Sequence, residues 1–330
     1  MSENREIIGK DTTTNTNIDI LCKNSIELIQ YARQIAAKQI NLVQLMTYYS
    51  IGRWIVEEQQ HGQSRAQYGK QVIKKLSEAL TEQFSRGFSV DTLENARKFY
   101  LNYQDRISET AFRKFAVEKT ETVFREFENT QPFTLPWSHY LLLMRIKNPD
   151  ERSFYEIEAA QAAWSIRVLQ RQYNSSLYER IALSRDKEAV MHLASEGNVI
   201  TKPADIVKQP TVLEFLGLEE STSYSETEFE TAIINKLQKF LLELGKGYLF
   251  EARQKRFTFD EDNYYDRFQK LPEENPTIGI LLCKEKNDAL VEITLPENSN
   301  IFATEYAFYL PDKKVLQNKL NEWIEEIGEE

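Results

Sequence analysis

Asp260, Glu261 and Asp262 form an acidic run whose carboxylate oxygens could hold a divalent cation. A calcium loop that began at Asp260 would also need a glycine and a final glutamate, at the positions that Tyr265 and Leu271 occupy. Because neither the glycine nor the final glutamate is present, we interpret the run as a solvated loop rather than as a metal site.

Two further groups of side chains, a serine–histidine pair and the cysteines with the histidines, are of types that could act in catalysis or bind a metal ion. Ser138 and His139 are a potential nucleophile and base, but neighbours on a helix point in different directions, so we predict a structural role for both. Cys22 and Cys283 lack the Cys-x-x-Cys spacing of a zinc site, and the three histidines are scattered. Isolated thiols are typical of a reducing compartment, so the sequence predicts a cytoplasmic protein without a metal or a small-molecule cofactor.

A short turn separates two amphipathic patterns, residues 66–84 and 89–103. The turn contains Gly87, and Ser89 can cap the helix that follows it. Two helices joined by a short turn with a glycine are the arrangement of a helix-turn-helix. The face of the second helix that we expect to be buried carries Val90, Leu93, Ala96 and Tyr100. The side chains that we expect to be free are Asp91, Thr92, Glu94, Asn95, Arg97 and Lys98.

This region predicts DNA contacts, because amide and guanidinium groups suit base edges and cationic groups suit phosphates. The candidate residues are Lys70, Arg86, Asn95, Arg97 and Lys98. Residues 68–106 carry a net charge of +2 and residues 214–243 carry −5, so a polyanion should meet the first half. The total charge of −10 argues against bulk coating of nucleic acid. The alternative is a helical hairpin that binds nothing, since Asp91 and Glu94 would repel phosphate.

The framework around these residues is predicted to be helical. After a disordered tail, residues 1–20, the apolar spacing predicts a helical domain over 21–185, a linker over 186–225 and a second domain over 226–330. The helices expected in the first domain are a long one or a close pair over 24–60, one from Trp137 after Pro136, and a long one from Glu151 to Glu179. Four arginines are expected on a solvated face, with phosphate contact as the alternative: Arg167, Arg171, Arg180 and Arg185.

The second domain is predicted to surround a small sheet, which makes the fold class α+β. A helix over 229–244 precedes three β-prone runs, 248–259, 277–283 and 289–295, and a last helix covers 313–327. No apolar run approaches the roughly 18–20 residues that cross a bilayer, so we expect no membrane contact.

Several motifs together resemble one family, the YhcG-type nucleases of the PDDEXK (restriction-endonuclease-like) superfamily, which is common in bacteria. In the first half they are 51–53, 57–60, 68–70, 87–89, 135–140, 154–155, 164–167 and 176–180, and in the second half 212–218, 240–245 and 278–284. The resemblance implies a winged-helix-like DNA-binding first half and a metal-dependent nuclease second half, with Mg²⁺ as the cofactor of intact relatives.

The catalytic motif that the resemblance implies is missing. Such nucleases place an Asp on one strand and Glu-x-Lys on the next, to hold a metal ion that activates water. Here Asn263-Tyr264-Tyr265 passes directly into Asp266-Arg267-Phe268, which resembles the segment beyond those strands. We interpret this junction as the result of a deletion of several tens of residues between two similar stretches.

No other group of residues is a convincing replacement. Glu251 and Arg253 imitate Glu-x-Lys, but arginine is a poor proton donor. Glu230 corresponds to the acid on the family's first helix and cannot hold a metal ion alone, and Asp266 fits the downstream segment better than the lost Asp. The sequence therefore predicts neither a catalytic residue nor a metal ligand.

Three functions are compatible with these observations. The first is a DNA-binding relative that does not cleave and pairs with itself or with an intact relative. The second is an active nuclease with an unrecognised or dimer-shared site. The third is a protein-interaction module, or the product of a broken gene whose truncated sheet exposes its edges.

Overall fold

The computed structural model describes residues 11–61, 66–118, 132–184, 187–200, 205, 208, 210–218, 224–245, 278–283 and 301–328. The chain divides into two compact units, Met1–Met144 and Arg145–Glu330. The predicted linker, residues 186–225, therefore lies inside the second unit, and the helices that follow Met144 belong with the C-terminal half. Among the described helices, none is both long and apolar enough to cross a membrane.

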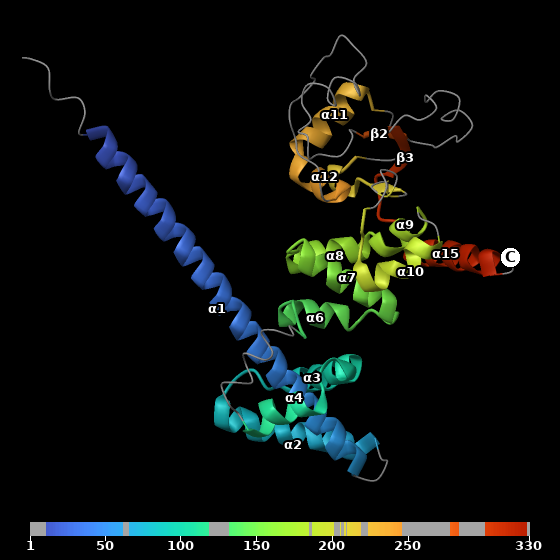
Figure 1. Ribbon diagram of the computed structural model, residues 1–330. Coiled ribbons are helices and arrows are strands. Elements are labelled where there is room, and N and C mark those ends of the chain that lie inside the picture. Colours follow the sequence, from blue (N-terminus) through green and yellow to red (C-terminus); the bar gives the residue numbers. More distant parts are fainter. Residues whose placement is uncertain are drawn as a thin grey trace, which may run out of the picture. The chain divides into compact units, whose positions relative to one another are not determined.

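The first unit is helical (Figure 1). Its elements are α1 (Asp11–His61), α2 (Ala66–Phe84), α3 (Val90–Tyr103), η1 (Gln104–Arg106), α4 (Glu109–Arg113), the π-helical turn η2 (Lys114–Glu118) and α6 (Trp137–Leu143). Helix α1 is one continuous helix, and it begins within the segment that composition predicted as a disordered tail. Helix α6 begins at Trp137 after Pro136, as predicted.

Helices α1 and α3 approach closely because Gly52 has no side chain. A Cβ atom on Gly52 would lie 2.1 Å from the carbonyl oxygen of Ala96 in α3. Nearby, Ile55, Ile73 and Leu93 form a buried cluster contributed by α1, α2 and α3. A small residue in α1 therefore permits the contact on which this helical core is built.

An aromatic cluster decides which face of α3 is buried. The Phe99 ring centroid lies 4.8 Å from that of Phe133 and 5.2 Å from that of Tyr103. The prediction of a buried face was right for Leu93 and Ala96 and wrong for Val90, which is 38% exposed. Because Phe99 and Tyr103 pack into this cluster, they are buried in place of Val90, and Tyr100 is only partly buried.

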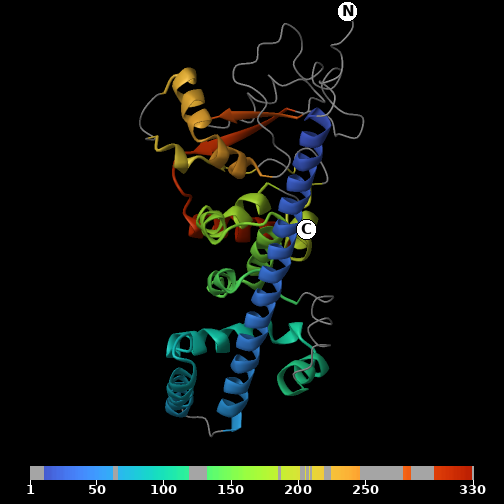
Figure 2. The same ribbon diagram turned by 90° about the vertical axis from the view of Figure 1, so that its left-hand side faces the viewer.

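The second unit combines helices with a small parallel sheet. Its helical elements are α7 (Pro149–Gln161), α8 (Ile166–Asn174), α9 (Leu177–Ala182), α10 (Lys187–Glu196), η4 (Glu214–Leu216), α11 (Glu226–Asn235), α12 (Leu237–Leu244) and α15 (Lys313–Gly328). The strands are β1 (Thr211–Val212), β2 (Gly279–Cys283) and β3 (Ile301–Ala307), in the order β1-β3-β2. Figure 2 shows β3 running beside β2, with Leu281 in register with Ala303.

Two predictions of long helices need correction. The stretch from Glu151 to Glu179 is divided among α7, α8 and α9, because Ala163 and Ser176 adopt the left-handed conformation and Ser165 caps α8. The predicted helix 229–244 is divided into α11 and α12 at Lys236, whose backbone leaves the helical region. Periodicity alone did not show these breaks, because the apolar spacing continues across them.

The predicted strands agree with the structure in part. Strand β2 confirms the β-prone run 277–283, and α15 confirms the terminal helix. The runs 248–259 and 289–295 lie outside the described residues. Strands β1 and β3 were not predicted, and β3 lies between the other two.

Candidate functional site

The turn between α2 and α3 has the predicted capping. The Thr92 amide donates a hydrogen bond to Ser89 Oγ at 3.2 Å, and Ser77 Oγ in α2 donates to the Phe88 carbonyl at 2.8 Å. Gly87 adopts a φ of +102°, which favours glycine. The helices, the turn and the cap are thus confirmed, whereas a helix-turn-helix that reads DNA stays a prediction.

Arg97 is not free, contrary to the sequence prediction. Its Nη1 donates to Gln59 Oε1 in α1 at 3.1 Å, and Gln59 Nε2 donates in turn to the Gly69 carbonyl in α2 at 3.3 Å. Arg97 Nε is buried in the space between the helices. The Arg97 guanidinium therefore joins the three helices and is held by the fold.

The other four candidate residues differ in exposure and position. Lys70, Arg86 and Lys98 are exposed, and Asn95 is partly buried. The Gln59 contacts bring the start of α2, with Lys70, close to the middle of α3, with Lys98. Arg86 lies beyond the other end of α2, on the order of 20 Å from Lys70 at 1.5 Å per helical residue. These cations are therefore spread along the unit rather than gathered into one pocket.

Ser138 and His139 are closer than the sequence suggested. Ser138 Oγ lies 3.4 Å from His139 Nδ1, so the expectation that the two side chains point apart was wrong. This distance is at the long limit of a hydrogen bond, and His139 is only 5% exposed. Burial of the ring supports the structural role that was predicted.

Of the residues that the sequence offered for metal-dependent cleavage, the structure describes only Glu230. Glu251, Arg253, Asp260, Glu261, Asp262 and Asp266 lie outside the described residues. Glu230 is partly buried on α11, and no group of three or more potential ligands occurs among the residues that the structure places. Strand β2 has no acidic residue, and the one on β3, Glu305, is exposed. The described strands therefore do not fit the Mg²⁺ ion of intact relatives.

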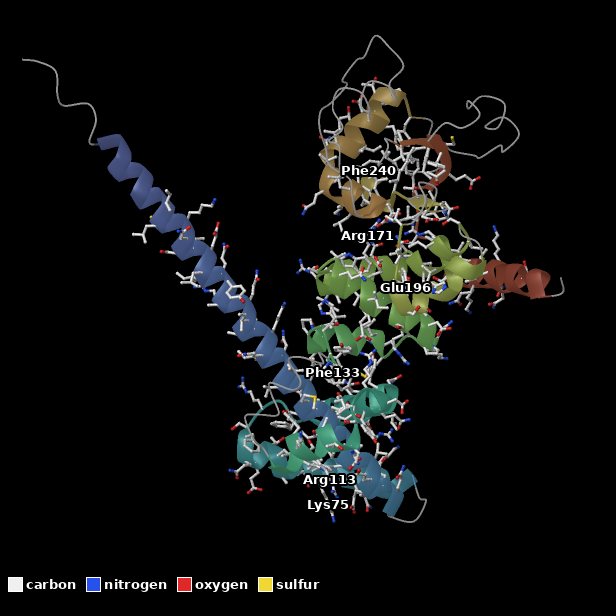
Figure 3. All side chains as sticks on the ribbon, in the orientation of Figure 1. Lys75, Arg113, Phe133, Arg171, Glu196 and Phe240 are labelled. Atoms are coloured by element: carbon white, nitrogen blue, oxygen red, sulfur yellow. The ribbon has the colours of Figure 1, made fainter. Side chains whose placement is uncertain are left out.

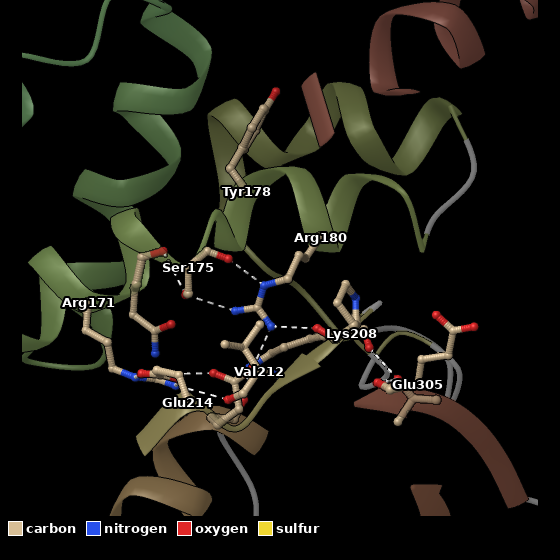
Figure 4. Close-up of polar contacts among 12 residues, drawn as sticks. Arg171, Ser175, Tyr178, Arg180, Lys208, Val212, Glu214 and Glu305 are labelled. Atoms are coloured by element: carbon tan, nitrogen blue, oxygen red, sulfur yellow. Dashed lines mark hydrogen bonds and ion pairs between the residues drawn. The ribbon is translucent and has the colours of Figure 1, made fainter. Parts of the chain in front are cut away.

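Instead, the second unit contains a buried charge network centred on Glu243 of α12. Glu243 Oε1 accepts from Arg180 Nη1 at 2.5 Å and from the Val212 amide at 3.0 Å, and Oε2 accepts from Arg171 Nη1 at 2.9 Å. Arg180 also donates to the backbone of Ser175 and Pro210 (Figure 4). Both oxygens of Glu243 are thus engaged by protein donors.

Arg171 and Lys208 complete this network. Arg171 makes two parallel hydrogen bonds to Glu214, at 2.9 and 3.0 Å, a geometry that only a guanidinium provides (Figure 4). Lys208 Nζ donates to the Glu243 backbone carbonyl, and the Lys208 carbonyl accepts from Thr304 Oγ1 in β3 at 2.6 Å. The network therefore joins helices α8, α9 and α12 to the sheet.

The electrostatics follow from this arrangement. Burial alone would raise the pKa of Glu243, but the charges of Arg180, Lys208 and Arg171 outweigh it and hold the pKa at about 2. Burial lowers the pKa of Lys208 to about 8, although the charge of Glu243 opposes this shift. Because the carboxylate is ionised and fully bonded, the cluster stabilises the fold and offers no free base or metal ligand.

A second group of charges attaches the C-terminal helix. Lys313 at the start of α15 forms ion pairs with Glu151 of α7 and, at 3.5 Å, with Glu179 of α9. Gln317 Nε2 donates to Glu179 Oε1 at 3.0 Å. Burial and the nearby charge of Glu179 raise the pKa of Glu151, and Lys313 opposes that rise.

The sequence did not indicate that these residues are buried and paired. It placed Arg171 and Arg180 on a solvated face, whereas Arg180 has no exposed surface and Arg171 is partly buried; Arg167 is exposed as predicted, and Arg185 is not described. The sequence feature that could have indicated their burial is a charged residue beside apolar residues. Glu243 lies within Leu-Leu-Glu-Leu, and Arg180 precedes Ile181. Charges in such runs are rarely buried unless they are paired.

Comparison with known proteins identifies the class of this chain. Residues 24–180 match the DUF1016 N-terminal domain, and residues 204–266 and 263–321 match the YhcG PDDEXK nuclease domain. The chain therefore belongs to the YhcG-type PDDEXK nuclease family, which confirms the resemblance. It is similar to the protein named "Putative nuclease YhcG" of Escherichia coli (strain K12), with 35% identity over 346 residues that span 89% of this chain and 91% of that relative. No solved structure matches the chain.

The form of these matches bears on the catalytic segment. The nuclease domain matches in two segments that share residues 263–266, the junction at which the sequence suggested a deletion. Since 89% of this 330-residue chain is about 294 residues, about 52 of the 346 aligned positions have no residue in this chain.

Proposed function

We propose that this protein is a DNA-associated member of the YhcG-type PDDEXK nuclease family that has lost the site for phosphodiester cleavage. The observation that carries this proposal is the two-segment match to the nuclease domain, whose segments overlap at residues 263–266. Two matches that share residues 263–266 are expected where a stretch of the family domain has no counterpart in this chain. The positions that the E. coli relative has and this chain lacks support the same interpretation.

The proposal of DNA contact depends on the first unit. Lys70, Arg86 and Lys98 are exposed cations on or beside two helices joined by a capped turn. Exposed lysine and arginine bind phosphates without reading sequence, whereas the partly buried Asn95 is suited to a base edge. Arg97 contributes by holding α3 in place through Gln59.

The decisive experiment measures cleavage and binding with the same full-length protein. Linear, branched and single-stranded DNA are incubated with Mg²⁺ or Mn²⁺, and binding is measured in parallel over a salt series. We expect salt-dependent binding without cleavage, because each phosphate contact contributes about 0.9 to the slope of log K against log salt. Metal-dependent cleavage that disappears when Asp260, Asp262 and Asp266 are replaced by Asn would overturn the proposal that the cleavage site has been lost.

A charge-reversal comparison locates the binding surface. Lys70→Glu, Arg86→Glu and Lys98→Glu together should weaken binding and reduce its salt dependence. The matched control reverses three exposed lysines of the second unit, Lys236, Lys239 and Lys319, and so changes the net charge equally. Equal loss of binding in both variants would show that the first unit is not the DNA-contacting surface, and no binding by the unmodified protein would favour an interaction module.

A further inference from the structure

The N-terminal half of α1 presents a large apolar surface. Every residue from Ile20 to Ile40 is exposed, and the helix extends beyond α2 and α3 in both ribbon views (Figures 1 and 2). Figure 3 shows its side chains with no other element of the first unit around them. The exposed large apolar residues are Ile20, Leu21, Ile26, Leu28, Ile29, Tyr31, Ile35, Ile40 and Val43.

These side chains cover an unusually wide arc. At 100° per residue, they spread over roughly two thirds of the helix circumference, where Asn24, Ser25, Arg33 and Gln39 also lie, and the remaining strip carries Lys23, Glu27, Gln30, Gln34 and Lys38. Large apolar residues that are exposed singly are normal on a protein surface, whereas a group of them along one helix marks an interaction surface. An isolated helix is also marginally stable in water, so this segment needs a packing partner.

The exposed apolar area is large enough for a small contact between two copies. A half-exposed Ile, Leu or Tyr side chain offers on the order of 100 Å². The nine side chains therefore offer about 900 Å² per copy, and the part that faces a single partner helix is smaller than the roughly 800 Å² that each partner buries in a standard interface.

The charges on α1 fit a second copy of the same helix. Glu27 and Lys38 are eleven residues apart, which is three turns plus about 20°, so they lie on the same edge of the apolar arc. In an antiparallel pair centred near Ala32, this edge of one helix meets the same edge of the other. Each exposed Glu27, which also lies 4.0 Å from Lys23 of its own helix, then lies beside Lys38 of the other copy, twice in the pair. Parallel pairing would instead put the two copies of this edge on opposite sides of the contact, so that Glu27 and Lys38 would not meet.

We propose that the protein self-associates through the exposed half of α1, residues 20–43, in an antiparallel arrangement of two copies. The proposal rests on exposure, area and charge, and it does not depend on DNA binding. In such a pair the two α2–α3 regions lie on the order of 60 Å apart, from 1.5 Å per residue along α1.

The first test is the mass of the full-length protein in solution, measured by sedimentation. We expect twice the monomer mass of 38.7 kDa. Leu28→Glu with Ile35→Glu should give the monomer, whereas Gln30→Glu with Gln34→Glu, on the polar strip, adds the same charge and should leave the mass unchanged. A monomeric unmodified protein, whether α1 is free or covered by another part of the chain, would overturn the proposal.

The second test fixes the orientation. Glu27→Lys or Lys38→Glu alone should weaken the dimer at low salt, and the double exchange should restore it, because the antiparallel contacts are re-formed with reversed sign. Failure of this rescue would overturn the antiparallel pairing. A Cys283→Ser variant provides a further check, because oxidation should then give no disulfide between the two copies of the exposed Cys22. Rapid formation of that disulfide would show parallel pairing.

Discussion

Arg180 donates a hydrogen bond to Glu243 across 2.5 Å, and neither side chain has any exposed surface. The two residues are 63 positions apart in the sequence. Arg180 ends the segment that matches the DUF1016 N-terminal domain, and Glu243 lies in the segment that matches the nuclease domain. The ion pair therefore joins residues that the family assignment places in separate domains.

Replacement of this carboxylate should destabilise the second unit. In Glu243→Gln, Arg180 keeps its charge but loses the carboxylate that compensates it, whereas Arg171 retains Glu214. Removal of one member of a buried ion pair costs about 3–5 kcal/mol. Urea unfolding followed by circular dichroism should show this loss, and the exposed Glu322→Gln should behave like the unmodified protein.

The lowered pKa of Glu243 predicts that the free energy of unfolding depends on pH in the acid range. The pKa of Glu243 in the fold is about 2, below the value of about 4.3 for a free glutamate. A lowered pKa stabilises the fold above the unfolded value, and this stabilisation is lost as the pH falls from about 4.3 towards 2. The free energy of unfolding should therefore decrease over that interval, and the decrease should be smaller in Glu243→Gln. An identical pH profile for the two proteins would contradict the shift.

Gly52 should tolerate no side chain. Gly52→Ala would place a Cβ 2.1 Å from the Ala96 carbonyl oxygen and force α1 and α3 apart. We expect a loss of about 2–3 kcal/mol or more in stability, measured by thermal unfolding. Gly69→Ala is the comparison, because its Cβ would lie 3.0 Å from Gln59 Nε2, the atom that donates to the Gly69 carbonyl. Alanine favours a helix by about 0.5–1 kcal/mol, which offsets this closer contact, so we expect a much smaller effect than at Gly52.

Replacement of Arg97 and replacement of its neighbour Lys98 should have different effects on the melting temperature. Arg97→Ala removes the hydrogen bond to Gln59 and should lower the melting temperature of the first unit, Met1–Met144, since about 1 kcal/mol corresponds to roughly 2–4 °C for a folded unit of about 150 residues. Lys98→Ala should leave the melting temperature unchanged, because Lys98 is exposed. A large destabilisation by Lys98→Ala would show that this residue also supports the fold.

Lys313 should control the pH response of the C-terminal helix. Lys313→Met leaves Glu151 and Glu179 without the cation, so the pKa of Glu151, already raised, should rise further. A raised carboxylate pKa means that stability is present at low pH and is lost as the pH rises through that pKa. The variant should therefore be least stable near neutral pH and recover on acidification, unlike Lys314→Met at an exposed position.

The sequence by itself determined the family and the local structure of several helices. Regular apolar spacing defined α2 at the observed bounds, Ser89 identified the start of α3, and the terminal helix began at Lys313 as predicted. These features depend on residues three or four positions apart, which a linear pattern shows directly.

Only the tertiary structure decided which side chains are buried and paired. It moved Arg171 and Arg180 from a predicted solvated face into contact with Glu243, 72 and 63 residues away. It also showed that Phe99 is buried in the core whereas Val90 is exposed, and that Arg97 donates a hydrogen bond to Gln59. Such partners are set by the path of the chain through space, because a buried charge is stable only where distant segments bring an opposite charge to it.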